Sequence, residues 1–277
     1  MDLELGGKKA VITGGSRGIG KSIAMSLAKE GVEVSICSRS MKALKSAARE
    51  IELETSQKVF FSEADTTSME SVNDFIEFSA TSLGGIDILI NNAGIPPREN
   101  TEQKILMVNY IGMKTFLDGM IGKLNRGASI VNTSSRAGSM WQENLKQVKR
   151  FMQLGVSELS NFVSKENIDP VRAYNLSKEA VNVLTISRTE ELLAKGLRIN
   201  SVCPAAVSTD ILQDFTNAFG EKVVKNIAKA GRPALPEEIA DLILYLISPE
   251  SGWVKGQNIT IDGGMSAIIT SDILNLN

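Results

Sequence analysis

The stretch Lys8-Lys9-Ala10-Val11-Ile12-Thr13-Gly14-Gly15-Ser16-Arg17-Gly18-Ile19-Gly20 decides the fold. Its first half is a short apolar run typical of a buried strand, and an amphipathic helical pattern follows it through Ala28. Glycines spaced Gly-x-x-x-Gly-x-Gly permit a tight turn and a close approach of the backbone to a pyrophosphate, which then lies over the amide-rich helix N-terminus. Strand, glycine turn and helix together predict a dinucleotide-binding unit.

Strand and helix patterns alternate along the rest of the chain. Apolar runs typical of strands lie at 32–37, 58–62, 86–90, 128–133, 197–202 and 258–261. Helical patterns lie around 72–78, over 101–124, in two short amphipathic helices between 141 and 167, from Tyr174 to about Ala194, and over 236–247. This alternation predicts an α/β fold, namely a Rossmann-type doubly wound parallel seven-stranded sheet with helices on both faces.

We expect one dinucleotide-binding catalytic domain over residues 1–277. It would carry a helical insertion at about 139–172 and a substrate lid at about 205–235. The expected lid is apolar, with Phe215 and Phe219 among its side chains. The expected helix from Tyr174 to Ala194 buries Ala180, Val181, Leu184 and Ile186.

Composition excludes several classes of function. The chain has 277 residues and a formal net charge of −2, which gives no electrostatic footprint for nucleic acid or an anionic membrane. It contains no histidine, which excludes a Ser-His-Asp triad, a histidine base and a histidine-ligated metal. Cys37 and Cys203 form neither a disulfide framework nor a paired zinc spacing. With no membrane-length apolar run, we expect a cytoplasmic protein without a metal site.

The residues at the end of the second strand indicate whether the cofactor is NAD or NADP. An acidic residue there would hold the ribose 2′-hydroxyl of NAD, whereas an arginine can pair with the 2′-phosphate of NADP. The chain has Ser38-Arg39-Ser40 at this place, and Arg17 in the glycine turn adds a second cation. NADP(H) is therefore favoured and NAD(H) is possible, although either arginine could instead be a solvated charge at a helix end.

Polar residues follow the other strands. Asp65 and Thr66 lie at the end of the third strand, where either an adenine contact or helix capping is consistent with the sequence. Asn91-Asn92-Ala93-Gly94 follows the fourth strand and can line a cofactor or fix strand ends. Asn109 is unusual within a helix, and Ser134-Ser135 follows the fifth strand.

Tyr174 and Lys178 are four residues apart on an expected helix, so their side chains share one face. A free phenol titrates near ~10, and a neighbouring cation that favours the phenolate would make it a usable proton donor and acceptor. The same spacing is common on ordinary helix surfaces, so the pair alone proves little.

Taken together and in order, these motifs resemble the short-chain dehydrogenase/reductase family over nearly the whole chain. Thr13-Gly14-x3-Gly18-Ile19-Gly20 is similar to its cofactor turn and Asn91-Asn92-Ala93-Gly94 to its sheet motif. Its catalytic tetrad is matched by Asn109, Ser135, Tyr174 and Lys178, with Ser135 preferred to Ser134 because it lies three residues before Gly138.

Segment lengths narrow the resemblance to the branch containing bacterial 3α-hydroxysteroid dehydrogenase/carbonyl reductase and coniferyl-alcohol dehydrogenase. Asn109 follows Gly94 by only 15 residues, while 39 residues separate Ser135 from Tyr174. Two features depart from the pattern: Arg39 conflicts with the NAD preference of that steroid enzyme, and Ala205 replaces a usual glycine after Pro204.

The resemblance implies hydride transfer between a nicotinamide and a carbonyl carbon, with Tyr174 exchanging the proton on oxygen and Ser135 hydrogen-bonding that oxygen. Lys178 would lower the pKa of Tyr174 and contact the nicotinamide ribose, and Asn109 would hold a water that links Lys178 to solvent. The cofactor would be held by Gly14, Ser16, Arg17, Gly18, Ile19, Gly20, Ser38, Arg39, Ser40, Asp65, Thr66, Asn92, Ala93, Gly94, Tyr174, Lys178, Pro204, Val207 and Thr209.

We therefore expect an NADP(H)-dependent carbonyl reductase or alcohol dehydrogenase acting on a hydrophobic, cyclic ketone or secondary alcohol. The apolar lid and Met140-Trp141 after Ser135 support a hydrophobic substrate. The alternatives are an NAD-dependent alcohol dehydrogenase of the same family and a non-catalytic nucleotide sensor or scaffold. We expect a homodimer, because the insertion could obstruct helices that pair between subunits in much of the family.

Overall fold

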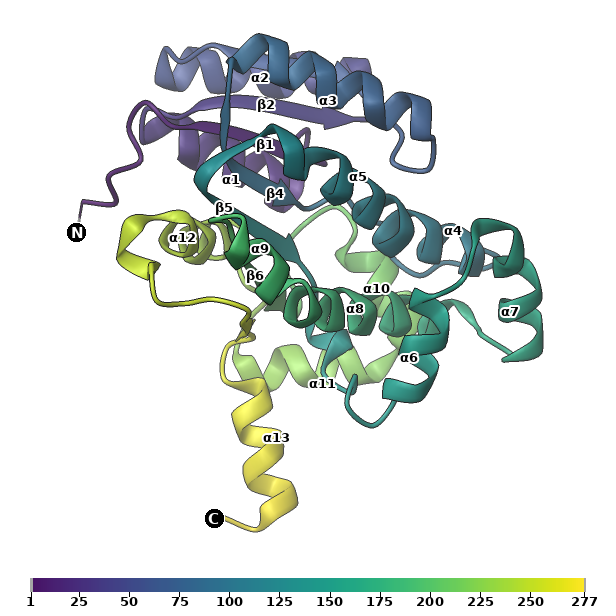
Figure 1. Cartoon of the computed structure of the whole chain (residues 1–277). Helices are drawn as coiled ribbons and strands as arrows, with labels where there is room; N and C mark the ends of the chain where they lie inside the picture. Colours follow the sequence, from purple (N-terminus) through teal and green to yellow (C-terminus); the bar gives the residue numbers. More distant parts are fainter. Residues whose placement is uncertain (1, 277) are drawn as a thin grey trace.

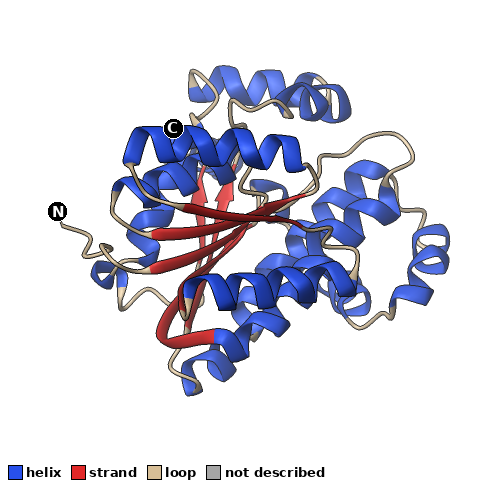
Figure 2. Ribbon diagram, turned by 90° about the horizontal axis from the view of Figure 1, so that it is seen from above, coloured by secondary structure: helices blue, strands red, loops and turns tan. Residues whose placement is uncertain are grey.

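The computed structural model describes residues 2–276, apart from the side chain at 222. Its centre is a seven-stranded parallel sheet in the order β3-β2-β1-β4-β5-β6-β7, which confirms the predicted fold class. Figure 2 shows helices on both sides of this twisted sheet. The strands are β1 (Lys9–Thr13), β2 (Glu33–Ser38), β3 (Val59–Glu63), β4 (Ile86–Asn91), β5 (Leu124–Thr133), β6 (Arg198–Pro204) and β7 (Asn258–Ile261).

Two apolar cores, one on each face of the sheet, pack the helices against the strands. One core contains side chains of α1, α2 and α12, and the other contains side chains of α3, α4, α5 and α8. Strand residues such as Ala10, Val11 and Ile12 are fully buried because a parallel sheet is covered on both faces. The helices are α1 (Gly18–Lys29), α2 (Met41–Thr55), α3 (Met69–Leu83), α4 (Glu102–Leu106), α5 (Met113–Met120), α6 (Leu145–Met152), α7 (Leu159–Lys165), α8 (Pro170–Ser187), α9 (Thr189–Ala194), α10 (Leu212–Phe219), α11 (Glu221–Ala230), α12 (Pro236–Ile247) and α13 (Met265–Leu274).

The order in which strands are added to the parallel sheet reverses between β1 and β4. The chain proceeds from β1 outward to β2 and β3, and then returns to place β4 on the other side of β1. Such a switch point opens a crevice at the carboxyl ends of the strands, which is where ligands bind in open α/β sheets. The sheet order therefore places the glycine turn after β1 at the middle of that edge.

The helix that carries Tyr174 differs from its prediction. It begins earlier, at Pro170, because the Asp169 side chain accepts a hydrogen bond from the Arg172 amide at 2.6 Å and proline suits a first helical turn. It ends at Ser187, and α9 is a separate helix. Ile186 was expected to be buried but is 42% exposed, since two residues beyond Leu184 the side chain lies on another face of the helix.

The region 101–124 is helical but irregular. Between α4 and α5 lies a π-helical turn, Met107–Gly112, which contains Asn109. Helical structure ends at Lys123 and β5 begins at Leu124, four residues before the predicted strand. β6 also differs from the predicted strand at 197–202, because it continues through Pro204, which pairs with Ile261 of β7.

Three groups of helices lie outside the layered body (Figure 1). The insertion forms the two predicted short helices, α6 and α7, which pack against α8 and α4 respectively. α10 and α11 form the segment predicted as a lid. α13 was not predicted, and it projects away from the sheet at the C-terminal end of the described chain.

Candidate active site

A cleft of about 980 Å³ opens at the carboxyl ends of the strands. It is lined by the residues that follow β1, β2, β3, β4, β5 and β6, together with parts of α8, α10 and α11. Of the predicted site residues, all but Gly20 and Asn109 line it. The structure therefore brings together at one edge of the sheet residues that are separated by up to 195 positions, from Gly14 to Thr209.

The glycine turn forms the floor of this cleft. Gly14 and Gly18 have φ values of +70° and +52°, a conformation that favours glycine. Arg17 precedes α1 without a side-chain capping bond, so the first amides of α1 have no side-chain partner there. Gly20 does not line the cleft but packs against the turn. A Cβ there would collide with the Gly14 carbonyl oxygen, so this position requires glycine.

The residues after β4 connect this strand to the glycine turn. The Thr13 hydroxyl oxygen accepts hydrogen bonds from the Asn92 and Ala93 amides at 3.0 and 3.1 Å. Asn92 Nδ2 donates to the Thr13 carbonyl oxygen at 3.2 Å, while Asn91 Nδ2 donates to Asn132 Oδ1 at 2.9 Å. Asn91 therefore joins two strands, whereas Asn92 both fixes the turn and lines the cleft.

The end of the cleft next to β1, β2 and β3 carries Arg17, Arg39 and Asp65. Within residues 2–276, leaving aside the side chain at 222, neither arginine forms an ion pair. Asp65 Oδ1 accepts hydrogen bonds from the amide and hydroxyl of Thr67, and the N-cap of α3 is Ser68. Ser68, three residues after Asp65, therefore caps the helix in place of Asp65. Asp65 lines the cleft near the positive charge of Arg39.

Ser135, Tyr174 and Lys178 lie together at the opposite end. Tyr174 is 7% exposed, and its hydroxyl is hydrogen-bonded to Ser135. Lys178 Nζ lies 5.8 Å from the centre of the Tyr174 ring and donates to the Thr133 carbonyl oxygen at 2.9 Å. Ser134 instead donates to the Lys178 carbonyl oxygen at 3.1 Å, so its hydroxyl fixes the helix backbone.

Burial dominates the titration of this pair. It raises the pKa of Tyr174 to about 12, and the hydrogen bond with Ser135 opposes this increase. Burial also lowers the pKa of Lys178 to about 8. Burial and the Ser135 contact thus determine the pKa of Tyr174 in the chain alone, and an effect of Lys178 on that pKa stays a prediction.

Asn109 supports the cleft from behind. Its Oδ1 accepts from the Ile95 amide at 2.8 Å, and its Nδ2 donates to the Ile95 carbonyl oxygen at 3.1 Å. A Cβ on Gly94 would lie 3.3 Å from Asn109 Oδ1 and 3.7 Å from Lys178 Nζ. Asn109 therefore holds the Gly94–Ile95 backbone next to Lys178, and a water between these groups stays a prediction.

The cleft fits a dinucleotide. It runs from two unpaired arginines past a helix N-terminus to a buried phenol and ammonium, which suits phosphates at one end and a reacting ring at the other. Thr133 Oγ1 and Asn175 Oδ1 are buried without hydrogen-bond partners among the described residues, and both residues line the cleft. Such orphaned polar atoms are suited to a bound ligand.

Comparison with known proteins identifies the family. A model described as short chain dehydrogenase matches residues 8–146, and one described as Enoyl-(Acyl carrier protein) reductase matches residues 145–266. Coniferyl-alcohol dehydrogenase of Pseudomonas sp. (strain HR199 / DSM 7063) is 30% identical over 268 residues, which cover 96% of this chain and 99% of that protein. The chain belongs to the short-chain dehydrogenase/reductase family. It is an oxidoreductase acting on CH–OH and C=O groups.

Two further relatives of this short-chain dehydrogenase/reductase are informative. Cyclohexanol dehydrogenase of Acinetobacter sp. (strain SE19) is 27% identical, and the match covers 96% of this chain and 98% of that protein. The structure of a 7α-hydroxysteroid dehydrogenase complexed with NADH and 7-oxo glycochenodeoxycholic acid is 27% identical with a TM-score of 0.77, covering 95% of this chain and 96% of that one.

An aromatic cover lies over the phenol of this short-chain dehydrogenase/reductase. The rings of Phe215 and Phe219 meet the Tyr174 ring edge-on, with centroids 5.1 and 6.3 Å away. Arg98 connects α10 to the loop after β4, because its guanidinium donates to both carboxylate oxygens of Asp214 at 3.0 and 2.7 Å. The predicted lid segment thus contacts both the reacting end of the cleft and the strand edge.

Several lining residues were not predicted. Asn175 directly follows Tyr174, and Arg136 directly follows Ser135. Asp262 and Met265 line the cleft from the turn after β7, where Asp262 lies 3.6 Å from Arg136. Their adjacency to predicted residues was the only sequence signal available for Asn175 and Arg136. Of the predicted pair Met140-Trp141, only Met140 lines the cleft.

Proposed function

We propose that this enzyme transfers a hydride between NADP(H) and a hydrophobic, cyclic ketone or secondary alcohol. The observation that carries the proposal is the position of Ser135, Tyr174 and Lys178 beneath phenylalanines, at the end of a cleft that begins at the glycine turn. The names of the cyclohexanol and hydroxysteroid relatives refer to cyclic secondary alcohols, which supports such a substrate here.

Two free arginines support NADP(H). The second strand ends in Ser38-Arg39, without a carboxylate to accept the hydrogen of a ribose 2′-hydroxyl. Arg17 and Arg39 both line the same end of the cleft and lack ion-pair partners within the described side chains, so each has donors free for a phosphate. The remaining predicted cofactor residues would hold the pyrophosphate, ribose and nicotinamide along the strand edge.

The side chains at the reacting end have separate tasks. When bound, the cofactor would supply or accept the hydride at the substrate carbon. In carbonyl reduction the Tyr174 phenol gives its proton to the carbonyl oxygen, and its raised pKa keeps that proton in place at neutral pH. Ser135 donates a hydrogen bond to the same oxygen as negative charge develops. Lys178 places a cation beside the phenolate that remains.

Alcohol oxidation uses the same groups in reverse. Tyr174 must then accept the hydroxyl proton, so it must first be ionised, and the Lys178 cation favours that form. We expect the aromatic cover to exclude water from the reacting atoms, which would strengthen these electrostatic effects. The same residues would thus serve both directions of the reaction.

Turnover assays test the proposal. The purified enzyme is given coniferyl alcohol or cyclohexanol with each oxidised cofactor, and 7-oxo glycochenodeoxycholic acid with each reduced one. We expect turnover of at least one ring substrate, and loss of it in Tyr174→Phe with cofactor binding retained. A nucleotide sensor would bind cofactor without turnover in either protein, and that result would refute the proposal.

A second assay tests the cofactor. The dissociation constants of NADPH and NADH are compared in the wild type and in Arg39→Ala. We expect the wild type to bind NADPH more tightly, and the variant to lose about tenfold or more of that preference because a charge-assisted hydrogen bond contributes about 1.5–3 kcal/mol. A wild type that binds NADH at least as tightly as NADPH would favour the NAD-dependent alternative, and an NADPH preference unchanged in Arg39→Ala would refute the role of Arg39.

We also propose a cytoplasmic homodimer. Both cysteines are buried and unpaired, as is common in a reducing compartment. In the described part of the chain no helix is long and apolar enough to cross a membrane. The insertion helices α6 and α7 pack on α8 and α4, and so cover surface that would otherwise pair with another subunit. Light scattering that gives a tetramer mass would contradict the dimer.

A further inference from the structure

A buried carboxylate lies directly beside the predicted catalytic lysine. Glu179 follows Lys178 on α8 and is only 1% exposed. Its two oxygens accept hydrogen bonds from Nη1 and Nη2 of Arg172 at 2.9 and 2.6 Å, and Oε1 also accepts from Asn144 Nδ2 at 2.8 Å. The proposed mechanism gives none of these side chains a role.

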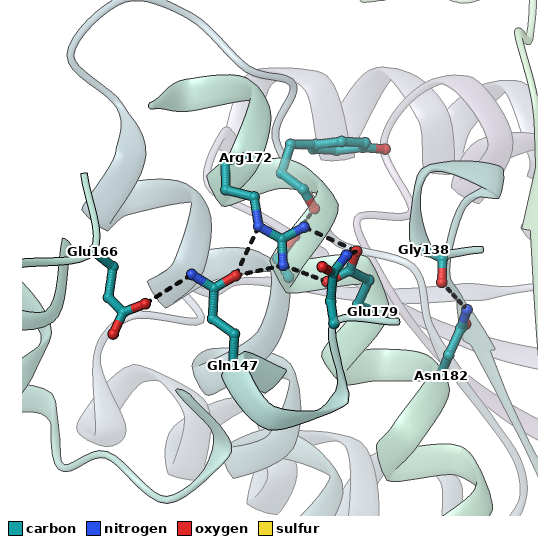
Figure 3. Close-up of polar contacts among 9 residues, drawn as sticks. Gly138, Gln147, Glu166, Arg172, Glu179 and Asn182 are labelled. Carbon is teal, nitrogen blue, oxygen red and sulfur yellow. Dashed lines mark hydrogen bonds and ion pairs between the residues drawn. The ribbon is translucent and has the colours of Figure 1, made fainter. Parts of the chain in front are cut away.

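The insertion supplies the other side of this contact. Gln147 of α6 accepts from Nε and Nη2 of Arg172 at 2.9 and 2.7 Å through its single amide oxygen. Its Nε2 donates to Glu166, just after α7, at 3.0 Å. Figure 3 shows the Arg172 guanidinium between Gln147 and Glu179, with Glu166 beyond Gln147. We refer to Gln147, Arg172 and Glu179 as the polar clamp.

The clamp spans the catalytic stretch of the helix. Arg172 and Glu179 are seven residues apart, which is about two turns or roughly 10 Å of α-helix. Tyr174 and Lys178 lie between them in the same two turns. A bond that joins both ends of this stretch fixes its length and rotation, and Gln147 fixes it relative to α6.

The same turns are also held from the side of the sheet. Gly138 lies so close that a Cβ there would be 2.7 Å from the Lys178 carbonyl, and Asn182 Nδ2 donates to the Gly138 carbonyl oxygen at 3.0 Å (Figure 3). Ser134 donates to the Lys178 carbonyl oxygen at 3.1 Å. The clamp is therefore a further support of these turns, and it is one that the insertion supplies.

The chemistry of the clamp favours orientation over stability. A bidentate arginine–carboxylate pair is strongly directional. Well-packed apolar side chains of similar volume often stabilise a protein at least as well as a buried ion pair does, so stability alone does not require these charges. Catalysis does require direction, because a displacement of about 1 Å can cost roughly a hundredfold in rate.

We propose that Gln147, Arg172 and Glu179 are positioning residues through which the insertion sets the place of the Tyr174 hydroxyl and the Lys178 ammonium in the cleft. This inference rests on the proposed roles of Tyr174 and Lys178. The residues act through α8 and touch neither substrate nor cofactor. The insertion thereby gains a function in catalysis besides any effect on assembly.

Four variants test the proposal. Arg172→Met breaks the pair, and Gln147→Leu removes the bonds of Gln147 to Arg172 and Glu166 while Asn144 still donates to Glu179. Arg172→Met/Glu179→Leu replaces the whole pair by apolar side chains of similar volume. The matched control is Arg150→Met, which removes an exposed arginine of α6 that bonds Glu166 at 2.9 Å and does not reach α8. Each protein is measured for kcat with cyclohexanol, NADPH dissociation constant, melting temperature and amide hydrogen exchange over residues 172–180.

We expect Arg172→Met to melt at lower temperature and the double variant to recover most of that loss. We expect kcat in the double variant and in Gln147→Leu to be lower by about tenfold or more, with the NADPH dissociation constant changed by less than about twofold and exchange over 172–180 faster than in the control. Should Arg172→Met fail to fold, the other two variants carry the test.

The proposal is overturned if the double variant regains control values of exchange over 172–180 together with its melting temperature, since the pair would then be merely structural. Control values of kcat in Gln147→Leu would refute the part assigned to the insertion. Activity in Tyr174→Phe would instead refute the proposed function, and the exchange measurement, which needs no turnover, would still decide whether the clamp orders α8. If cyclohexanol is not turned over, that exchange comparison is the deciding result.

Discussion

The buried ammonium of Lys178 should make the stability of this enzyme depend on pH in the alkaline range. Burial lowers the pKa of Lys178 from 10.5 to about 8, and the neighbouring Cys203 partly opposes this change. The unfolded chain keeps the lysine protonated up to about 10.5, whereas the folded chain releases the proton near 8. Between these values the unfolded state holds the Lys178 proton more often than the folded state does, so the contribution of Lys178 to stability must rise with pH.

The size of the effect follows from the pKa difference. At about 1.4 kcal/mol per pH unit, a change from 10.5 to about 8 corresponds to roughly 3 kcal/mol. Below pH 8 the folded state bears the whole penalty of burying the charge. A measurement from pH 7 to pH 10 should therefore capture about 2–3 kcal/mol of it.

The assay compares the wild type with Lys178→Met by urea unfolding at pH 7, 8, 9 and 10, followed by circular dichroism. The variant lacks the titrating group but also leaves the Thr133 carbonyl without its donor, which should lower stability by about 1–2 kcal/mol at every pH. The difference between the two proteins should therefore grow in favour of the wild type as the pH rises. Taking the difference removes most of the contribution from cysteine and tyrosine titration.

Lys146→Met is the matched control, because Lys146 is an exposed lysine of α6. It should keep the wild-type dependence on pH. Parallel stability curves for the wild type and Lys178→Met from pH 7 to pH 10 would refute the reasoning, since the buried lysine would then have no penalty to lose.

Three further predictions concern the cleft. Gly20→Ala should weaken cofactor binding by about tenfold or more and cost about 1–3 kcal/mol of stability, because its methyl group meets the Gly14 carbonyl; calorimetry with NADPH checks this against Gly122→Ala, where a Cβ has open space. Phe215→Ala should raise the KM for a cyclic alcohol by about 3–10-fold through the lost ring contact with Tyr174 while leaving the melting temperature nearly unchanged; an unaltered KM would show that α10 does not cover the substrate. Arg98→Met should change global stability by less than about 1 kcal/mol, since its ion pair is largely exposed, yet speed proteolysis within α10; equal proteolysis rates would refute a role in holding that helix.

Local patterns predicted much of the site because they repeat over short distances. The glycine turn is recognisable from the strand before it and the helix after it, and the ends of successive parallel strands must meet at one edge. Arg39, Asp65 and Ser135 could therefore be assigned to a common cleft before any coordinates, and the structure places all three there.

Contacts between distant segments were not predictable in this way. From the sequence, Gly20 was predicted to contact the cofactor like Gly14 and Gly18. Its close packing against Gly14, which only the structure shows, makes it a support of the turn. Asn109 was expected to hold a water near Lys178, which stays a prediction, but the bonds of its amide to the Ile95 backbone and the π-helical turn around it carry no signal in the sequence. Ile186 fits a helical pattern, yet no neighbouring element covers its side of α8 enough to bury it.

The sequence by itself determined the family, the order of the elements and the residue types that meet at the strand ends, because periodicity, turn chemistry and spacing are properties of neighbouring residues. Only the tertiary structure decided which side chains are buried and what they contact. It gave Tyr174 a raised pKa and Lys178 a lowered one, and it brought Gln147 of the insertion against Arg172. Burial and long-range hydrogen bonds depend on segments far apart in the chain, and no local pattern contains that information.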